Sequence, residues 1–410
     1  MDPERTLSGP LIPVGEARER LLADAAPLGS ETVALNDAHG RVLAAGITAR
    51  RTQPPQAVSA MDGYAVRASD IANSPADLDL IGEAAAGHPF EGKVGVGQTV
   101  RIFTGSVVPG GADTVMLQEN ATVLADGRIR SNQSEPAGRH IRAAGLDFKQ
   151  GQSVLPAGTM IDAGALCLAA AANHPDLPVI RKPRVGILAT GDELLLPGSV
   201  PGPGQIIASN SYGVAALARE AGGDAIDLGI VADREADLAD RLDRAVADEL
   251  DILVTLGGAS VGDHDLVQKV FVARGMELDF WRIAMRPGKP LMFGRLGDMR
   301  ILGLPGNPVS AMVCAILFLR PLLEKLGGRD FAQRRVPAVL DAPMRENDRR
   351  EDYVRAATYR AESGELHVTP FPVQDSSMIS TFARSDALII RPPHAPSAAI
   401  GDTVEILELK

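Results

Sequence analysis

The sequence predicts a multidomain protein of mixed α/β and β class, with a central doubly wound α/β domain between β-rich segments. Between residues 184 and 328, brief apolar runs bounded by glycine alternate with helical patterns, which is typical of a parallel sheet built from β-α-β units. Short apolar runs separated by turn residues dominate residues 32–158 and 336–407, which indicates small β-structures. A length of 410 residues accommodates several domains, each with its own core.

The first segment begins with a helix and continues as short strands. A helix is predicted over residues 14–26, where Leu21, Leu22 and Ala25 are spaced for one buried face. Strands are predicted at 32–35, 79–81, 100–103 and 114–118. A second, alanine-rich helix is predicted over 163–172, ended by Asn173, His174 and Pro175.

The elements of the α/β segment follow from the same periodicities. Strands are predicted at 185–189, 225–229, 252–256 and 301–304, and helices at 210–221, 235–249, 265–274 and 309–326. After Gly327 and Gly328, five strands are predicted at 336–340, 353–359, 366–368, 387–390 and 403–407. Five strands in so short a segment indicate a small barrel or sandwich.

Composition argues against several classes of protein. With 41 Lys and Arg against 52 Asp and Glu, the net charge of −11 argues against nucleic-acid binding, which needs clustered positive charge. Cys167 and Cys314 are the only cysteines, too few for a disulfide scaffold or a cysteine-based zinc site. The longest apolar stretch, 311–319, is too short to span a membrane, and residues 1–10 lack the apolar core of a secretory signal. We therefore expect a soluble cytoplasmic protein without a membrane partner.

Candidate site residues follow the predicted parallel strands, because open α/β sheets bind ligands at the carboxyl ends of their strands. The segments after the four strands are 190–193, 230–233, 257–265 and 305–310, and three of them contain glycine. Glycine admits an anion close to backbone N–H groups, and Ser260 and Ser310 add hydroxyl donors. Taken singly, each loop is equally well explained as a tight turn with capping side chains. Together, the loops favour an anion site, although neither a GxGxxG motif nor a P-loop follows these strands.

Charged residues of both signs lie in or near these loops. The carboxylates Asp192, Glu193, Asp233, Asp263 and Asp265 are too many for an anion pocket alone, whereas Mg²⁺ commonly bridges carboxylates and phosphate. A cationic segment around Pro287 and Gly288, next to the single Trp281, suits a tetrahedral oxyanion; its cations are Arg282, Arg286 and Lys289. An exposed basic loop is the plainer explanation of that segment.

Six motifs appear in an order that resembles the molybdopterin molybdenumtransferase family, the bacterial MoeA type to which a part of gephyrin is related. The motifs are SAMDGYA (59–65), RIFTG (101–105), TGDEL (190–194), GGASVGDHD (257–265), RPGKP (286–290) and LPGNPVSA (304–311). The resemblance covers nearly the whole chain.

The resemblance implies insertion of molybdate into adenylylated molybdopterin, with release of AMP and with Mg²⁺ assisting. It implies a homodimer whose composite cleft lies between the α/β domain of one subunit and the lid domain and C-terminal barrel of the other. It also implies four domains: a linking domain of residues 1–50 and 149–180, a β-rich lid domain of 51–148, the α/β molybdopterin-binding domain of 181–328, and a C-terminal β-barrel of 329–410. Further partners would be the adenylyltransferase of the preceding step and recipient molybdoenzymes.

Functional residues are carried over position by position. The catalytic residues would be Asp62, Thr104, Glu193, Asp233 and Asp265, with Glu193, Asp233 and Asp265 near Mg²⁺. Substrate-binding residues would be Gly257, Gly258, Ser260, Arg282, Arg286, Lys289, Pro305, Asn307, Ser310, Arg350, Ser376 and Ser377. A further functional carboxylate would fall on Asp147. This chain has Arg282 and Arg286 where many family members have lysine, and a planar guanidinium does not reproduce a point-charge contact.

Two alternatives remain at this stage. The adenylyltransferase of the preceding step resembles residues 181–328 alone, and it has no place for Asp62 and Thr104. A non-catalytic, pterin-binding scaffold or carrier would be consistent with the two lysine-to-arginine changes.

Overall fold

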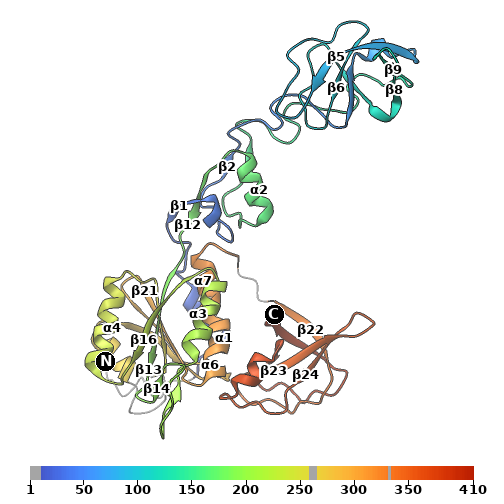
Figure 1. The fold of residues 1–410 in the computed structure, drawn as a ribbon. Coiled ribbons are helices and arrows are strands. Elements are labelled where there is room, and N and C mark those ends of the chain that lie inside the picture. Colours follow the sequence, from blue (N-terminus) through green and yellow to red (C-terminus); the bar gives the residue numbers. More distant parts are fainter. Residues whose placement is uncertain (1–10, 258–265, 331–333) are drawn as a thin grey trace. The chain divides into compact units, whose positions relative to one another are not determined.

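The computed structural model describes residues 11–257, 266–330 and 334–410. The chain forms two compact units (Figure 1). One unit is Thr32–Val179, and the other combines Met1–Glu31 with Ile180–Lys410. The predicted boundaries of four domains are finer than this division and stay a prediction.

The central sheet of the larger unit has six strands in the order β16-β13-β17-β21-β20-β18. Their bounds are β16 Asp224–Val231, β13 Arg184–Thr190, β17 Ile252–Leu256, β21 Met299–Leu304, β20 Pro290–Leu296 and β18 Glu277–Arg282. The first four are the predicted strands, and they pair in parallel. The antiparallel strands β20 and β18 were not predicted; they flank residues 281–290, the segment interpreted as a cationic loop.

Helices cover both faces of this sheet, as expected of a doubly wound fold. One core joins Ile187 and Val254 to helices α1 (Val14–Leu22), α3 (Asn210–Glu220), α6 (Pro308–Cys314) and α7 (Arg320–Leu326). The other core joins Leu188 and Leu253 to helices α4 (Glu235–Ala247) and α5 (Leu266–Ala273). Neighbouring residues of one strand thus face opposite cores, which is the period of a pleated strand. A π-helical turn, η5 (Ala315–Leu319), separates α6 from α7 just before Pro321.

The C-terminal strands close into a five-stranded barrel rather than a sandwich. They are β22 (Arg335–Leu340), β23 (Glu351–Arg360), β24 (Leu366–Pro370), β25 (Ala387–Arg391) and β26 (Thr403–Glu408). Their order is β23-β24-β22-β26-β25, and the antiparallel pairing of β25 with β23 closes the ring. A short helix, α8 (Ile379–Ala383), precedes β25. The two-residue strand β19 (Met285–Arg286) of the α/β part pairs with β23.

The smaller unit contains a six-stranded sheet in the order β7-β4-β6-β5-β9-β8. The bounds are β7 Thr114–Leu117, β4 Gly63–Val66, β6 Gln98–Ile102, β5 Ala76–Ala84, β9 Ile129–Ser131 and β8 Ala121–Val123. Short 3₁₀ turns lie at Leu35–Asp37 (η2), Ala68–Asp70 (η3) and Gln118–Asn120 (η4). We call residues 51–148 the lid segment, after the role that the resemblance implies.

Three two-stranded ribbons and one helix are formed by other residues of the segment 30–180. The ribbons pair β1 (Ser30–Ala34) with β12 (Asp176–Ile180), β2 (Ile47–Thr48) with β11 (Ser153–Leu155), and β3 (Val58–Ser59) with β10 (Ile141–Arg142). Helix α2 (Ala163–Ala171) begins at Asp162, whose Oδ1 accepts a hydrogen bond of 2.8 Å from the Ala165 N–H. The mixed α/β and β multidomain class predicted from the sequence is confirmed.

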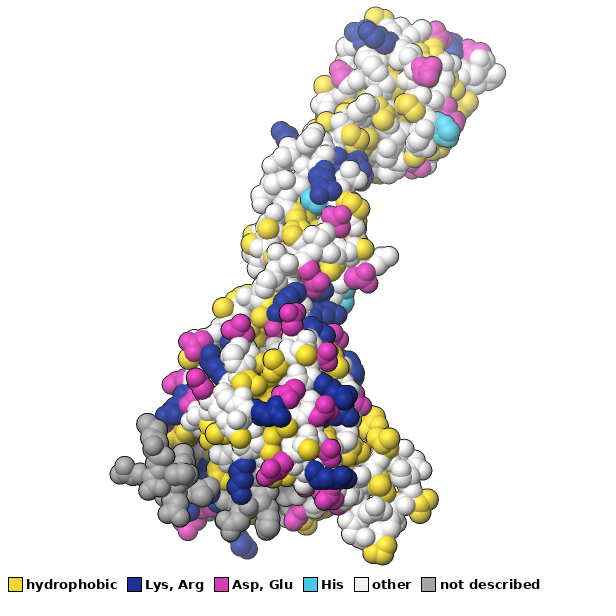
Figure 2. Space-filling model, turned by 90° about the vertical axis from the view of Figure 1, so that its left-hand side faces the viewer, with side chains coloured by type: hydrophobic (Ala, Val, Ile, Leu, Met, Phe, Trp, Pro, Cys, Tyr) yellow, Lys and Arg dark blue, Asp and Glu magenta, His cyan; other side chains and the backbone are white. Residues whose placement is uncertain are grey.

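Acidic and basic side chains are interspersed on the surface shown in Figure 2. On α4, Arg244 Nε lies 3.1 Å from Asp240 Oδ2, and Arg234 Nε lies 3.6 Å from Asp237 Oδ2. These pairs are one helical turn apart, the spacing at which side chains on a helix meet. Among the described residues, none of the helices combines the length and the apolar character that crossing a bilayer requires.

Candidate active site

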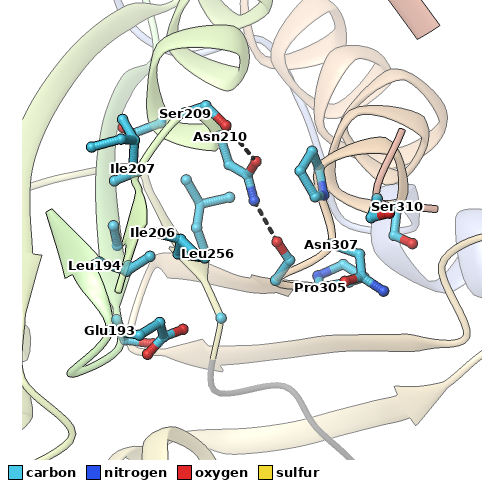
Figure 3. Close-up of a pocket in the computed structure, with 18 of the residues that line it drawn as sticks. Glu193, Leu194, Ile206, Ile207, Ser209, Asn210, Leu256, Pro305, Asn307 and Ser310 are labelled. Atoms are coloured by element: carbon cyan, nitrogen blue, oxygen red, sulfur yellow. Dashed lines mark hydrogen bonds between the residues drawn. The ribbon is translucent and has the colours of Figure 1, made fainter. Parts of the chain in front are cut away.

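A cavity of about 650 Å³ lies at the edge of the central sheet where the parallel strands end (Figure 3). Its floor includes Thr190 at the end of β13 and Leu256 at the end of β17. Strands β14 (Leu194–Leu195) and β15 (Ile206–Ile207) form an apolar wall. Such a volume is typical of a small-molecule site, and its place at the strand ends agrees with the general rule for open α/β sheets.

The cavity brings together seven of the residues predicted for the site. They are Glu193, Asp233, Gly257, Pro305, Asn307, Ser310 and Ser377. Gly258, Ser260 and Asp265 lie outside the described residues. Arg282, Arg286, Lys289, Arg350 and Ser376 are not among the lining residues, and Asp62 and Thr104 belong to the smaller unit. The functional assignment of all these residues stays a prediction.

Gly257 lines the cavity at a position where a side chain of any other residue type would clash with the backbone. Its φ of 98° lies in the left-handed region that glycine adopts without strain. A Cβ atom at this position would lie 2.6 Å from the Thr190 carbonyl oxygen. Strands β13 and β17 therefore end in close contact here, with the backbone exposed to the cavity.

One end of the cavity is acidic. The backbone N–H of Asp233 donates to Asp192 Oδ1 at 3.2 Å, which places two consecutive strand ends side by side. Partial desolvation, followed by the negative charges of Asp192 and Glu193, raises the pKa of Asp233. Within the described ranges, no three Asp, Glu, His or Cys side chains form a metal-binding group. The third predicted ligand, Asp265, lies outside those ranges.

The raised pKa of Asp233 leads to a prediction about stability. The ionised carboxylate is disfavoured in the folded protein, so its cost is present at neutral pH and disappears once pH falls below the ordinary carboxyl range. Without divalent cations, Asp233→Asn should raise Tm by about 1–2 °C at pH 7 and leave it nearly unchanged at about pH 3. Differential scanning calorimetry at both pH values measures this effect. Asp237→Asn on α4 is the control, and a lower Tm for Asp233→Asn at pH 7 would contradict the argument from desolvation and repulsion.

The opposite side of the cavity is neutral and rich in hydrogen-bond donors. Asn210 Nδ2 donates to the Gly306 carbonyl oxygen at 2.7 Å and fixes the loop that follows β21 (Figure 3). Asn307 Nδ2 donates to Ser376 Oγ at 2.9 Å, and the Val309 N–H donates to the Ser376 carbonyl oxygen at 3.0 Å. These bonds hold a loop of the C-terminal barrel against the α/β part, so that the next residue, Ser377, lines the cavity.

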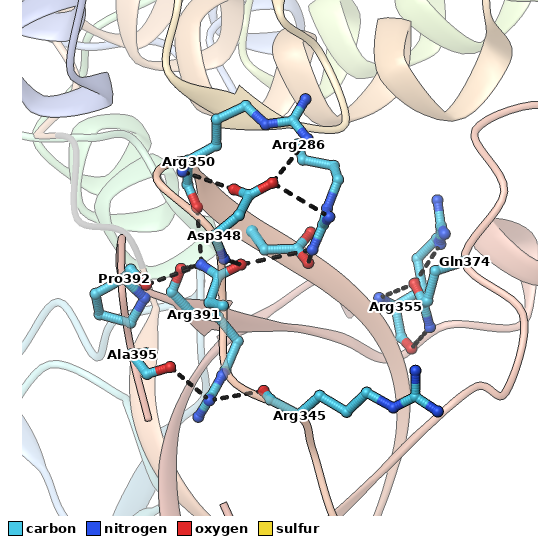
Figure 4. A network of polar contacts seen from close by, with 11 residues as sticks. Arg286, Arg345, Asp348, Arg350, Arg355, Gln374, Arg391, Pro392 and Ala395 are labelled. Carbon is cyan, nitrogen blue, oxygen red and sulfur yellow. Dashed lines mark hydrogen bonds and ion pairs between the residues drawn. The ribbon is translucent and has the colours of Figure 1, made fainter. Parts of the chain in front are cut away.

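Arg286 and Arg350 both contact carboxylates of the C-terminal segment (Figure 4). Arg286 lies on β19, where its Nη2 forms an ion pair with Asp352 on β23 and its Nη1 lies 3.7 Å from Asp348. Arg350 Nη2 donates to Asp348 Oδ2 at 2.9 Å. Arg286 thus connects β19 to β23, whereas Arg350 binds a carboxylate two residues away in its own loop; neither arginine lines the cavity.

Trp281, next to the predicted cationic segment, belongs to the core. Its ring is 8% exposed and packs with the residues beneath α4 and α5. Arg282 lies over this ring, with Cζ 5.2 Å from the centroid. Lys289 is partly buried and directly precedes Pro290, which lines the cavity. Of the three predicted cations, Lys289 is the one whose neighbour in the sequence, Pro290, lines the cavity.

Sequence reasoning missed two residues: Asn210, which lines the cavity, and Arg355, which binds Gln374 in the loop before Ser377. Asn210 was interpreted only as a helix start. Arg355, on β23, is 1% exposed; its backbone N–H and its Nε both donate to Gln374 Oε1 at 2.9 Å (Figure 4). No hydrogen-bond partner of Arg355 Nη1 is present in the described part of the chain. The sequence signal for Arg355 was its position as a charged residue inside the mostly apolar predicted strand 353–359.

Asp62 and Thr104, which we call the lid pair, meet in the smaller unit. The backbone N–H and the hydroxyl of Thr104 each donate to Asp62 Oδ1 at 2.7 Å. These two bonds and the nearby charge of Arg101 lower the pKa of Asp62. Gly63 follows directly, and a Cβ there would lie 2.0 Å from the Met116 carbonyl oxygen. The turn is thus built to present an ionised, solvent-exposed carboxylate.

Asp147 lies in the same unit, where its backbone N–H donates to the Gln53 carbonyl oxygen at 3.0 Å.

Comparisons with known proteins cover nearly the whole chain. Residues 12–173 match the MoeA N-terminal region (domain I and II), residues 186–325 a probable molybdopterin binding domain, and residues 337–409 the MoeA C-terminal region (domain IV). A molybdopterin molybdenumtransferase of Haemophilus influenzae is 34% identical, covering 97% of this chain and 98% of that protein. One of Bacillus subtilis is also 34% identical, covering 97% and 94%. A crystal structure of a molybdopterin biosynthesis MoeA protein from Pyrococcus horikosii has a TM-score of 0.82 at 28% identity, covering 98% of this chain and 100% of that one.

Proposed function

This chain belongs to the molybdopterin molybdenumtransferase family, and on that premise we propose that it transfers molybdenum from molybdate to adenylylated molybdopterin and releases AMP. The observation that carries the proposal is one cavity with two chemically different sides. Glu193 and Asp233 supply carboxylates on one side, and Asn307, Ser310 and Ser377 supply neutral donors on the other. A substrate with a phosphate group at one end and an oxyanion acceptor at the other is complementary to such a cavity.

The acidic side suits Mg²⁺. Carboxylate oxygens are the ligands that Mg²⁺ prefers, and it usually takes only one or two of them beside water and substrate phosphates. Partial desolvation, followed by the charges of Asp192 and Glu193, raises the pKa of Asp233, and a bound cation would offset both effects. We propose that Glu193 and Asp233, with Asp265, hold the ion. When bound, Mg²⁺ would neutralise the phosphate oxygens of the departing AMP.

The neutral side and its surroundings suit the oxyanion and the pterin. We propose that Asn307, Ser310, Ser376 and Ser377 donate hydrogen bonds there, and that Gly257, Gly258 and Ser260 receive the phosphate. Arg282 and Lys289 would supply positive charge, supported by the place of Lys289 next to Pro290. Arg286 and Arg350 would act indirectly, because their guanidinium groups hold the barrel carboxylates. The buried cation of Arg355 would support the loop that carries Ser376.

We further propose that the active form is a homodimer with a composite site. The resemblance implies that the lid segment of one subunit faces the cavity of the other. The lid pair supports this arrangement because it is solvent-exposed and already organised by its own hydrogen bonds. In the composite site, the carboxylate of Asp62 would face the substrate from the partner.

A turnover assay tests the function directly. Purified protein with molybdate, Mg²⁺ and adenylylated molybdopterin should release AMP and produce cofactor that activates an apo-molybdoenzyme. No AMP release from intact substrate would refute the catalytic proposal, and tight substrate binding without turnover would identify a scaffold or carrier. Adenylylation of molybdopterin with ATP would identify the preceding enzyme instead. Parallel reactions with tungstate establish which oxyanion is preferred.

A further inference from the structure

Arg101 contacts both chain segments that carry the lid pair. Its Cζ lies 5.0 Å from the ring centroid of Tyr64 and 5.0 Å from that of Phe103, so the guanidinium contacts both rings. Its Nη1 donates to the Gly63 carbonyl oxygen at 3.3 Å. Gly63 directly follows Asp62, and Phe103 directly precedes Thr104. The guanidinium thus touches the chain neighbour of each member of the pair.

A second route connects Arg101 to the backbone of Asp62. Arg101 Nη2 donates to Gln118 Oε1 at 2.6 Å, and the backbone N–H of Gln118 donates to the Asp62 carbonyl oxygen at 3.3 Å. Asp62 is therefore fixed through Gly63 on one side and through Gln118 on the other. Both terminal nitrogens of Arg101 already donate to protein acceptors, so direct substrate binding would require breaking these contacts.

We propose that Arg101 is a positioning residue, which holds Asp62 and Thr104 in the geometry that the reaction requires. The proposal rests on the function proposed above for the lid pair. Arginine suits this place because its planar group stacks on aromatic rings while its nitrogens donate in fixed directions. The ammonium group of lysine retains the charge but lacks the plane and the fork.

Activity measurements separate positioning from substrate binding. Arg101→Met should lower kcat by about 10- to 100-fold, since small misplacements of a reacting group have effects of this size. KM should stay within about threefold, and Arg101→Lys should lose nearly as much kcat because charge alone does not restore the stacking. A large rise in KM with kcat retained would instead show a substrate contact and would overturn the proposal.

The matched control is Arg130→Met in the same lid segment. Arg130 forms two hydrogen bonds to the carboxylate of Asp77, of 2.6 and 2.9 Å, so its replacement also removes an arginine with a fixed partner. We expect Arg130→Met to leave kcat unchanged. An equal loss of kcat in the two variants would show that Arg101 acts only through general stability of the lid segment.

A double-mutant cycle tests whether Arg101 acts through Asp62. In an Asp62→Ala background, Arg101→Met should lower kcat much less than it does in the wild-type background, because the carboxylate that it positions is absent and only Thr104 remains. The full loss in that background would place the effect of Arg101 elsewhere and overturn the proposal.

The Thr104 amide resonance gives a readout that does not depend on activity. In full-length protein labelled with ¹⁵N-threonine, this resonance is assigned by its loss in Thr104→Ser. Arg101→Met should shift it toward its position in Asp62→Ala, whereas Arg130→Met should leave it in place. An unchanged Thr104 resonance in Arg101→Met overturns the positioning role. A fully active Asp62→Ala would instead refute the proposed function of the lid pair, so the two failures are distinguishable.

Discussion

Replacement of Asp62 by alanine should lower kcat by about 100-fold or more while leaving Tm within about 1 °C of the wild-type value. The carboxylate is solvent-exposed and accepts two hydrogen bonds, one from the backbone N–H and one from the hydroxyl of Thr104. Its loss removes an ionised group from the reaction but no part of a hydrophobic core. Steady-state AMP release and calorimetry on the same preparation measure the two quantities.

Asp79→Ala is the matched control for this variant, because Asp79 is another exposed aspartate of the lid segment. We expect it to leave both kcat and Tm unchanged. A loss of several degrees in Asp62→Ala would show that Asp62 serves the fold of the turn. Wild-type kcat in Asp62→Ala would remove it from the reaction altogether.

Replacement of Glu193 by glutamine should lower kcat by about 100-fold and abolish the dependence of the rate on Mg²⁺. Glutamine retains the size of the side chain and removes the charge that we propose for the cation. Isothermal titration of Mg²⁺ and turnover over a range of Mg²⁺ concentrations measure the change. In the wild-type protein, removal of divalent cations with a chelator should produce a comparable loss that added Mg²⁺ reverses.

Glu235→Gln, at the exposed start of α4, is the control for general electrostatic effects. It removes the same charge outside the cavity and should leave Mg²⁺ binding unchanged. If Glu193→Gln still bound Mg²⁺ with wild-type affinity, the metal assignment of Glu193 would be wrong.

The same two variants test the composite site. If the lid pair of one subunit serves the cavity of the other, a mixed dimer of Asp62→Ala and Glu193→Gln contains one fully intact site. Random mixing of equal amounts should then restore about a quarter of the wild-type activity. If each site were built within one subunit, every site would carry one substitution and mixing would restore nothing.

Sequence periodicity predicted the part of the fold that local pattern determines. The four parallel strands and the helices between them were found because buried strands are continuously apolar and surface helices are amphipathic. Strand β18 was not predicted because its last residues, Trp281 and Arg282, belong to the segment interpreted as a cationic loop. The choice between barrel and sandwich depends on the pairing of β23 with β25, a contact between distant segments that neither strand encodes alone.

The candidate site divides in the same way. Glu193, Asp233, Gly257 and Asn307 were found because the ends of parallel strands share one edge. The partners of Arg286 escaped because they lie on a barrel strand more than 60 residues along the chain. The motif therefore identified a charged residue but not the partner of its side chain. That partner decides whether the charged group binds a ligand or another part of the protein.

The C-terminal barrel has a core of its own, and one of its faces also packs into the hydrophobic core of the α/β part. Tyr353, Leu388, Ile390 and Leu407 belong to the same buried cluster as residues of α1 and α6. A chain truncated before residue 334 would expose that apolar face to water and leave Arg286 without its carboxylate partner. We therefore expect the barrel and the central sheet to fold and unfold together, as one cooperative unit.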